Sequence, residues 1–207
     1  MSPDRRPVRT ERGLDRLVTF LDAIVAIAIT LLVLPLVDVL ASAEAGADLG
    51  SVVAEEVAQF GTFLLSFVVI SRLWLVHHRL VETVGSYDDA FLVANLAWSC
   101  TVVLLPFATQ VMALFGTDRA AVATYIGTIT ASSACLSTIA VLVWRRPHLR
   151  ESRTHVPPRP TGGLVTTGTL VVALVVGVLV PSVNYFALLL LFLTGPVERR
   201  LHPGRPG

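Results

Sequence analysis

The chain has few charged residues, and its sixteen basic residues are all arginine. Charged residues make up 15% of the 207 residues, whereas a soluble domain carries roughly 25%. Apolar residues make up 54%, and the mean hydropathy is +0.72. This composition excludes an ordinary soluble domain, so we expect an integral membrane protein with about half or more of its residues in lipid.

The chain also lacks the residue patterns of several enzyme and transport classes. Its two cysteines, Cys100 and Cys135, lie in apolar runs and form neither a disulfide framework nor a metal motif. The sequence shows no Ser/His/Asp set, no paired carboxylates of the kind that acid–base catalysis needs and no Gly-rich nucleotide loop. We therefore expect no enzymatic activity, no ATP-driven transport, no metal or cofactor and no nucleic-acid partner.

Six apolar segments approach the length of about 20 residues that a membrane span needs. We place them at about residues 17–40, 52–76, 89–114, 120–144, 163–180 and 183–198. The last two are short and are separated only by Pro181 and Ser182, as in a tight helical hairpin. The prediction is an all-α membrane domain at 17–201, preceded by a polar N-terminus at 1–16 and followed by a disordered tail at 202–207.

Arginines are concentrated in alternate connections. They cluster in residues 1–16, in the Pro-rich loop at about 145–162 and in the C-terminal tail. On the opposite side Arg119 is the only arginine, and it is accompanied by the acidic residues Glu44, Asp48, Glu55 and Glu56. Because cytoplasmic loops carry the excess of arginine, we predict a multi-pass protein of the cell membrane with both termini and the 145–162 loop in the cytoplasm.

Residues 16–34 form a helix-length apolar run with Arg16 and Asp22 near its start. Each helical residue turns by about 100°, so one stripe collects Arg16, Phe20, Ala23, Ile27, Thr30, Leu31 and Leu34. Asp22 points about 140° away from Ile27 and must find partners on other helices, because an unpaired charge in a membrane span is costly. The stripe is suited to a symmetry axis, although apolar stripes also face lipid or the core in ordinary membrane helices.

Polar residues recur in the next two segments. Trp74 and two adjacent histidines close the second segment. The histidines lie on different helix faces and are poor joint metal ligands, so we expect His77 to hydrogen-bond to Asp22 or to backbone. In the third segment Asn95 needs a partner, and Pro106 removes one helical hydrogen bond and is expected to kink the helix.

Three motifs occur in order along these first three segments. They are Arg16-x-x-x-Phe20-Leu21-Asp22, then Trp74-x-x-His77-His78, then Asn95 followed by Leu105-Pro106-Phe107-Ala108-Thr109. The first resembles the Arg-x-x-x-Phe-Ser-Asp signature of the transmembrane protein 175 family of endosomal/lysosomal and prokaryotic potassium channels, and the other two resemble its second and third helices. The resemblance covers mainly residues 16–112. The signature serine is Leu21 here, a change expected to alter the packing near Asp22.

The resemblance implies a homotetramer of six-helix subunits, in which the first helix of each subunit lines the pore on the symmetry axis. It implies an apolar constriction with a nearby threonine hydroxyl, at Ile27, Thr30, Leu31 and Leu34. It also implies a structural network that holds the pore helix, formed by Arg16, Phe20, Asp22, Trp74, His77 and Asn95. The Thr-Val-Gly-Tyr-Gly filter loop of ordinary potassium channels is missing from the sequence.

We therefore expect a prokaryotic potassium-permeable cation channel, weakly selective for potassium over sodium, whose apolar ring opposes hydrated ions by dewetting. Its expected partners are further copies of the chain, the lipid bilayer, and potassium and other monovalent cations. Two alternatives stay open. One is a proton-conducting channel or secondary transporter in which Asp22 and His77 carry protons, and the other is a structural membrane protein without transport.

Overall fold

The computed structural model describes residues 11–43, 46, 48–116, 118–151 and 160–179 of the chain. Their helices are α1 (Glu11–Leu31), α2 (Leu34–Ser42), α3 (Leu49–Glu55), α4 (Val57–Val81), α5 (Asp89–Phe115), α6 (Arg119–Arg145), the 3₁₀-helix η1 (Pro147–Leu149) and α7 (Thr161–Leu179). When α1 and α2 are taken as one rod, the described residues contain 5 helices long and apolar enough to cross a membrane. The described part is therefore an all-helical, multi-pass membrane protein.

The three predicted segments at 89–114, 120–144 and 163–180 correspond to α5, α6 and α7 within two residues at each end. The predicted segment at 183–198, the tail at 202–207 and residues 152–159 of the predicted loop lie outside the described residues. The predicted polar N-terminus at 1–16 is partly helical, because α1 already begins at Glu11. Leu14 (6% exposed) and Leu17 (8% exposed) explain this early start, since they extend the buried face of α1 toward its N-terminal end.

The predicted first segment at about 17–40 lies within one candidate membrane span, Arg12–Ser42, but the helix in this span is interrupted after Leu31. Pro35 has no N–H to donate to the carbonyl of Leu31, four residues earlier. The chain tightens instead, with the N–H groups of Leu32 and Val33 each donating to a carbonyl three residues back at 3.3 Å. α2 then begins at Leu34 and carries Pro35 in its first turn, where a missing N–H is tolerated.

The predicted second segment at 52–76 is also two helices. The carboxylate of Asp48 caps the short α3 by accepting a hydrogen bond from the N–H of Ser51 at 3.0 Å. α3 ends at Glu55, and α4 begins at Val57 and runs five residues beyond the predicted end. The additional residues carry His77 and His78, which therefore lie within the last turns of a helix.

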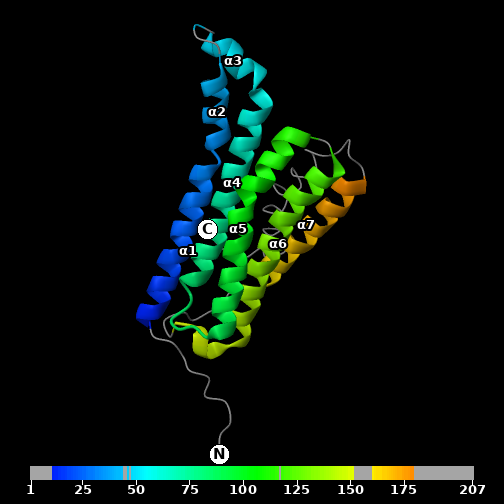
Figure 1. Cartoon of the computed structure of the whole chain (residues 1–207). Helices are drawn as coiled ribbons and strands as arrows, with labels where there is room; N and C mark the ends of the chain where they lie inside the picture. Colours follow the sequence, from blue (N-terminus) through cyan, green and yellow to red (C-terminus); the bar gives the residue numbers. More distant parts are fainter. Residues whose placement is uncertain (1–10, 44–45, 47, 117, 152–159, 180–207) are drawn as a thin grey trace, which may run out of the picture.

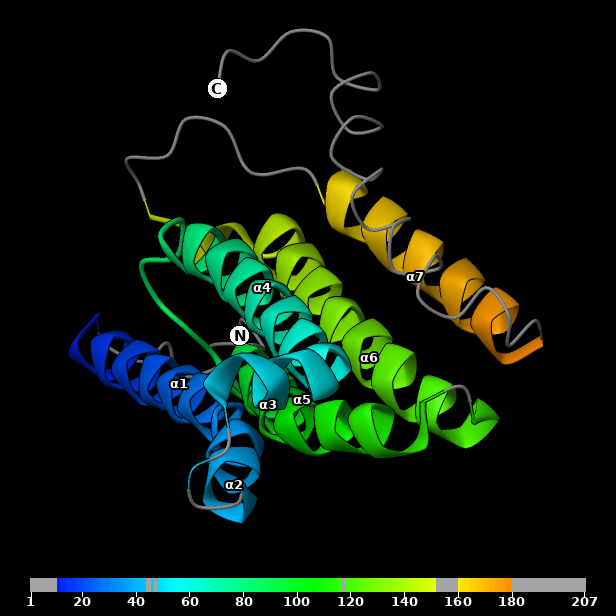
Figure 2. The same cartoon turned by 90° about the horizontal axis from the view of Figure 1, so that it is seen from above.

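The helices pack as a bundle in which α5 contacts α1, α4 and α6 (Figure 2). α7 packs along α6 at the edge of the bundle. α2, α3 and the first turns of α4 project beyond the ends of α5 and α6 (Figure 1). The projecting end carries Asp48 and Glu55, and Arg79 and Arg145 lie at the opposite end of the bundle. The charge asymmetry predicted from the sequence thus coincides with the long axis of the bundle.

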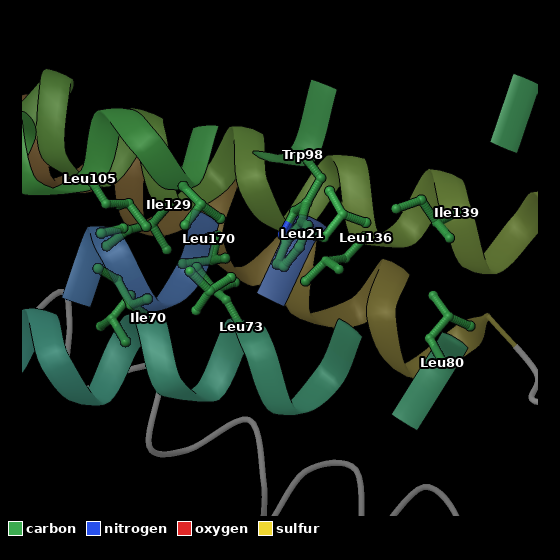
Figure 3. Close-up of a cluster of buried hydrophobic side chains, with 14 of the residues drawn as sticks. Leu21, Ile70, Leu73, Leu80, Trp98, Leu105, Ile129, Leu136, Ile139 and Leu170 are labelled. Atoms are coloured by element: carbon green, nitrogen blue, oxygen red, sulfur yellow. The ribbon is translucent and has the colours of Figure 1, made fainter. Parts of the chain in front are cut away.

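The core is a single apolar cluster between α1, α4, α5, α6 and α7 (Figure 3). Leu21, at the position of the signature serine, is 1% exposed and belongs to this cluster. Trp98 of α5 belongs to the same cluster and is fully buried. α1 is therefore attached to the rest of the chain mainly through its apolar face.

At the arginine-rich end, the α4–α5 connection is joined to the turn after α6. Val84 and Arg150 form an isolated antiparallel bridge, and the N–H of Gly85 donates to the carbonyl of Leu149 at 2.9 Å. Asp88, 3% exposed, caps α5 and pairs with Arg146. Burial alone raises the pKa of Asp88, but hydrogen bonds from the Phe91 N–H and Arg146 outweigh this, so the net pKa lies below the ordinary carboxyl value.

Candidate pore face and its supporting network

α1 has two faces of opposite exposure. The buried face consists of Leu14, Leu17, Leu21, Val25 and Ala28. The other face presents large apolar side chains, namely Phe20 (53% exposed), Ile27 (59%), Leu31 (42%) and, across the junction in α2, Leu34 (52%). Arg16, Ala23 and Thr30 are exposed as well, so the structure places every residue of the predicted stripe on the accessible face of a single chain. We call this surface the α1 stripe.

From Phe20 to Leu34 the α1 stripe is apolar apart from one hydroxyl group. The Oγ1 of Thr30 donates a hydrogen bond to the carbonyl of Ile27 at 2.8 Å. This bond uses the hydroxyl proton and leaves the oxygen with its lone pairs free to accept a hydrogen bond or contact a cation. Chemically, the stripe offers an apolar surface of about four helical turns with one oxygen ligand per chain.

Asp22 lies outside the α1 stripe, and its side chain contacts α4. The indole Nε1 of Trp74 donates to its Oδ1 at 2.9 Å. The Trp74 ring stacks on the ring of His78, with centroids 5.2 Å apart and planes tilted by 23°. The Nε2 of His78 lies 3.3 Å from Oε1 of Glu82, so a chain of contacts connects the middle of α1 to the end of α4.

His77 is 1% exposed and belongs to a second set of contacts, between α4 and α5. Its Nε2 lies 2.8 Å from Oδ1 of Asn95, whose Nδ2 donates to the carbonyl of Phe91 at 2.8 Å. Because the Asn95 oxygen is the acceptor in this arrangement, the ring proton is assigned to Nε2. The residues that were predicted as one network therefore form two separate pairs, Trp74–Asp22 and His77–Asn95, and His77 Nε2 bonds to Asn95 rather than to Asp22.

Sequence reasoning missed Trp98, which stacks on His77 with ring centroids 4.0 Å apart and planes 7° from parallel. Its Nε1 is fully buried and has no hydrogen-bond acceptor among the described residues. Trp98 follows Asn95 by three residues, and residues at this spacing share one helix face. That spacing was the signal that could have placed Trp98 beside the network.

Sequence reasoning also assigned no partner to the buried hydroxyl group of Ser66. Ser66 Oγ lies 3.0 Å from the Tyr125 hydroxyl and 2.8 Å from Oγ1 of Thr109. Thr109 donates to the carbonyl of Leu105 at 2.8 Å, one residue before Pro106. α5 continues through Pro106, and this cluster of hydroxyl groups connects α4, α5 and α6 at that level.

The described residues contain no group of three or more His, Cys, Asp or Glu side chains arranged to hold a metal ion. The candidate site consists of the exposed α1 stripe and two hydrogen-bonded pairs of side chains, Trp74–Asp22 and His77–Asn95.

Residues 16–106 match the sequence model of the family described as endosomal/lysosomal potassium channel TMEM175. This part of the chain is therefore similar in sequence to the TMEM175 family. This is a family of ion channels, not of enzymes. The matched region includes all the residues of the α1 stripe, both hydrogen-bonded pairs and Trp98.

Individual named proteins match this chain over longer stretches. A potassium channel of Streptomyces collinus is 29% identical over 167 residues, which cover 78% of this chain and 80% of that protein. A potassium channel of Chamaesiphon minutus is 34% identical over 107 residues, 52% of each chain. The rat endosomal/lysosomal proton channel TMEM175 is 26% identical over 145 residues, and the match covers 29% of its length. The chain therefore corresponds to less than a third of this vertebrate relative.

The fold is similar to a crystal structure described as that of a lysosomal potassium-selective channel TMEM175 homologue from Chamaesiphon minutus. The TM-score is 0.69, and the match covers 89% of this chain and 97% of the other at 22% identity. At this identity the likeness establishes a shared fold.

Proposed function

We propose that this chain is one subunit of a homotetrameric, potassium-permeable cation channel whose pore is lined by the α1 stripe. The observation that carries the proposal is the exposure of Phe20, Ile27, Leu31 and Leu34 on one face of a helix whose other face is buried. A helix at the edge of a bundle that exposes its apolar side chains in a row is suited to packing around a symmetry axis. One such helix cannot enclose a path, so conduction requires several copies.

The ion path in this proposal is an apolar ring formed by Ile27 from each subunit, with further rings at Leu31 and Leu34. A narrow apolar ring opposes hydrated ions by dewetting and admits them when it widens. Potassium holds its water less tightly than sodium, so such a ring gives a modest preference for potassium. The free lone pairs of Thr30 Oγ1 add one oxygen ligand per subunit close to the ring.

In the proposed topology the arginine-rich end of the bundle faces the cytoplasm of a prokaryotic cell, with both termini on that side. The projecting end formed by α2, α3 and the start of α4 then lies outside the cell. Asp48 and Glu55 at that end are placed to raise the local concentration of cations near the outer mouth.

Proton conduction is the second candidate, because the matched vertebrate proteins are named proton channels. The contacts of Asp22 and His77 favour a structural role over a proton relay. Asp22 accepts a hydrogen bond from Trp74, and His77 is bonded to Asn95 and stacked on Trp98. These contacts support the interpretation in which Asp22 and His77 hold α1 in place and the ion passes along the opposite face.

The test is the variant Ile27→Asn, measured as potassium and sodium flux into liposomes that contain the purified protein. An amide in the ring wets the constriction, so we expect a higher potassium flux and a potassium-to-sodium preference closer to one. Val172→Asn is the matched control, because Val172 (57% exposed) is as exposed as Ile27 but lies on α7 at the edge of the bundle. Both variants add one amide to an exposed apolar position.

Unchanged flux and selectivity in Ile27→Asn would remove Ile27 from the ion path. A wild-type protein that carries a proton flux but no potassium flux would favour the second candidate. A wild-type protein with neither flux, despite an intact oligomer, would refute the channel proposal itself.

A further inference from the structure

A small pocket lies behind the junction of α1 and α2. Its volume is about 20 Å³, and a cavity needs about 10–15 Å³ to hold one water molecule. The wall formed by α1 and α2 includes Leu31 and Pro35, and polar side chains from α4 and α5 form the opposite wall. The pocket is therefore large enough for one water molecule and borders the interruption in the first membrane span.

The interruption leaves backbone groups without their helical partners. The carbonyl of Leu31 loses its donor because Pro35 has no N–H. The N–H of Leu36 donates to the carbonyl of Val33 at 3.0 Å, so it does not serve Leu32 as it would in a continuous helix. Non-helical backbone at membrane depth is tolerated only where protein buries it or where it borders water.

The polar side chains that line the pocket have hydrogen-bonding capacity to spare. Gln59 Nε2 donates to the carbonyl of Pro35 at 3.2 Å. The hydroxyl groups of Thr62 and Thr109 each donate to a carbonyl of their own helix at 2.8 Å. This leaves two lone pairs on the Thr62 oxygen and one on the Thr109 oxygen, which is also hydrogen-bonded to Ser66 Oγ at 2.8 Å. The side-chain amide of Gln110 lines the pocket and makes no hydrogen bond with the described residues, so its N–H groups and its oxygen can bind water.

We propose that this pocket is a binding site for one water molecule, held between the Gln110 amide and the free carbonyl groups of the α1–α2 junction. A buried water molecule makes about three hydrogen bonds, and these groups supply both donors and acceptors for it. The water satisfies the junction from the side of α4 and α5, and Leu31 of the α1 stripe borders the pocket. Leu31 precedes the junction and Leu34 follows it. The water therefore lies beside the backbone that sets the orientation of α2, which carries Leu34, relative to α1, which carries Leu31.

The site is independent of the proposed ion conduction, because it follows from the pocket, its polar lining and the interrupted helix. The test is therefore not a flux measurement. X-rays convert bound water into hydroxyl radicals that oxidise the side chains beside it, and the modified residues are identified by mass spectrometry. Phe63 lines the pocket, and Phe67 lies one turn later on the same helix and is 41% exposed on the single chain.

In the wild-type protein in lipid nanodiscs we expect Phe63 to be oxidised several-fold faster than Phe67. Gln110→Leu keeps the approximate size of the side chain and removes its hydrogen-bonding groups, so it should lower the Phe63 rate to that of Phe67. Gln110→Glu is the matched variant that retains polar atoms, and it should keep most of the labelling.

Equal rates at Phe63 and Phe67 in the wild-type protein would overturn the proposal, and so would an unchanged Phe63 rate in Gln110→Leu. The wild-type comparison decides the question even if the leucine variant fails to fold. The outcome is also separate from the channel proposal, since a protein without ion flux can still contain the water.

Discussion

The two tryptophans behind the α1 stripe allow a test in which the same chemical change has opposite expected effects. Trp74 Nε1 donates to Asp22 at 2.9 Å, whereas the buried Nε1 of Trp98 has no acceptor among the described residues. Replacement of tryptophan by 3-benzothienylalanine exchanges the N–H for sulfur and keeps the shape of the ring. The perturbation therefore removes one donor and leaves the packing nearly unchanged.

The expected free energies follow from these contacts. A hydrogen bond to a charged group contributes about 1.5–3 kcal/mol, so the replacement at Trp74 should lower the free energy of unfolding by about this amount. A buried donor left unsatisfied costs about 1–3 kcal/mol, so the replacement at Trp98 should raise the free energy of unfolding by a comparable amount. Ordinary hydrogen bonds between membrane helices average only about 0.6 kcal/mol, which sets the lower bound for Trp74.

The assay is unfolding in mixed detergent micelles by titration with sodium dodecyl sulfate, followed by circular dichroism. The same replacement at Trp144, which is 44% exposed, is the control and should change the free energy of unfolding little. Destabilisation of equal size at Trp74 and Trp98 would refute the reasoning, because ring shape and not the indole N–H would then be the quantity that matters.

Two further predictions concern the ends and the edge of the bundle. Because the pKa of Asp88 is lowered in the folded protein, its stabilisation is present above the unfolded carboxyl pKa and is lost as the pH falls through the folded value. Unfolding measured against pH should therefore have an acid-sensitive limb below about pH 4 that Asp88→Asn reduces, and an unchanged limb would contradict this assignment. In α7, a Cβ at Gly177 would lie 3.1 Å from Val122 Cγ1, whereas one at Gly168 would meet nothing within 4 Å. Gly177→Leu should therefore lower the free energy of unfolding, measured by thermal unfolding, by about 1–3 kcal/mol, and Gly168→Leu should lower it much less. Similar losses in the two variants would show that α7 packs on α6 through another face.

The α1 stripe could be predicted from the sequence because helical periodicity is a local property. Seven positions separated by one, three or four residues share a face in a straight helix, and the structure exposes all of them. The interruption after Leu31 was missed, although Pro35 was visible in the sequence. A proline near the end of an apolar run is compatible both with the end of a helix and with a second helix that continues the same direction, and the packing of α2 decides between them.

The partners of Asp22 show the other limit of sequence reasoning. Trp74, His77 and Asn95 were expected as one network, and the structure divides them into Trp74–Asp22 and His77–Asn95. Trp74 and His77 are three residues apart and lie near each other on α4, so the sequence cannot rank them. The choice depends on how α4 packs between α1 and α5. The bridge between Val84 and Arg150 could not be predicted from the sequence either, because no local pattern connects residues so far apart in the chain.

Leu21, at the signature position, belongs to the same apolar cluster as Trp98, whose indole N–H has no acceptor among the described residues. A serine hydroxyl accepts hydrogen bonds, and a leucine side chain accepts none. Leu21 is 1% exposed within this cluster. Burial of a leucine contributes about 1.5–3 kcal/mol, which offsets the cost of about 1–3 kcal/mol for an unsatisfied donor. At this level α1 is therefore held by apolar packing through Leu21, and the Trp74–Asp22 hydrogen bond is its polar link to α4.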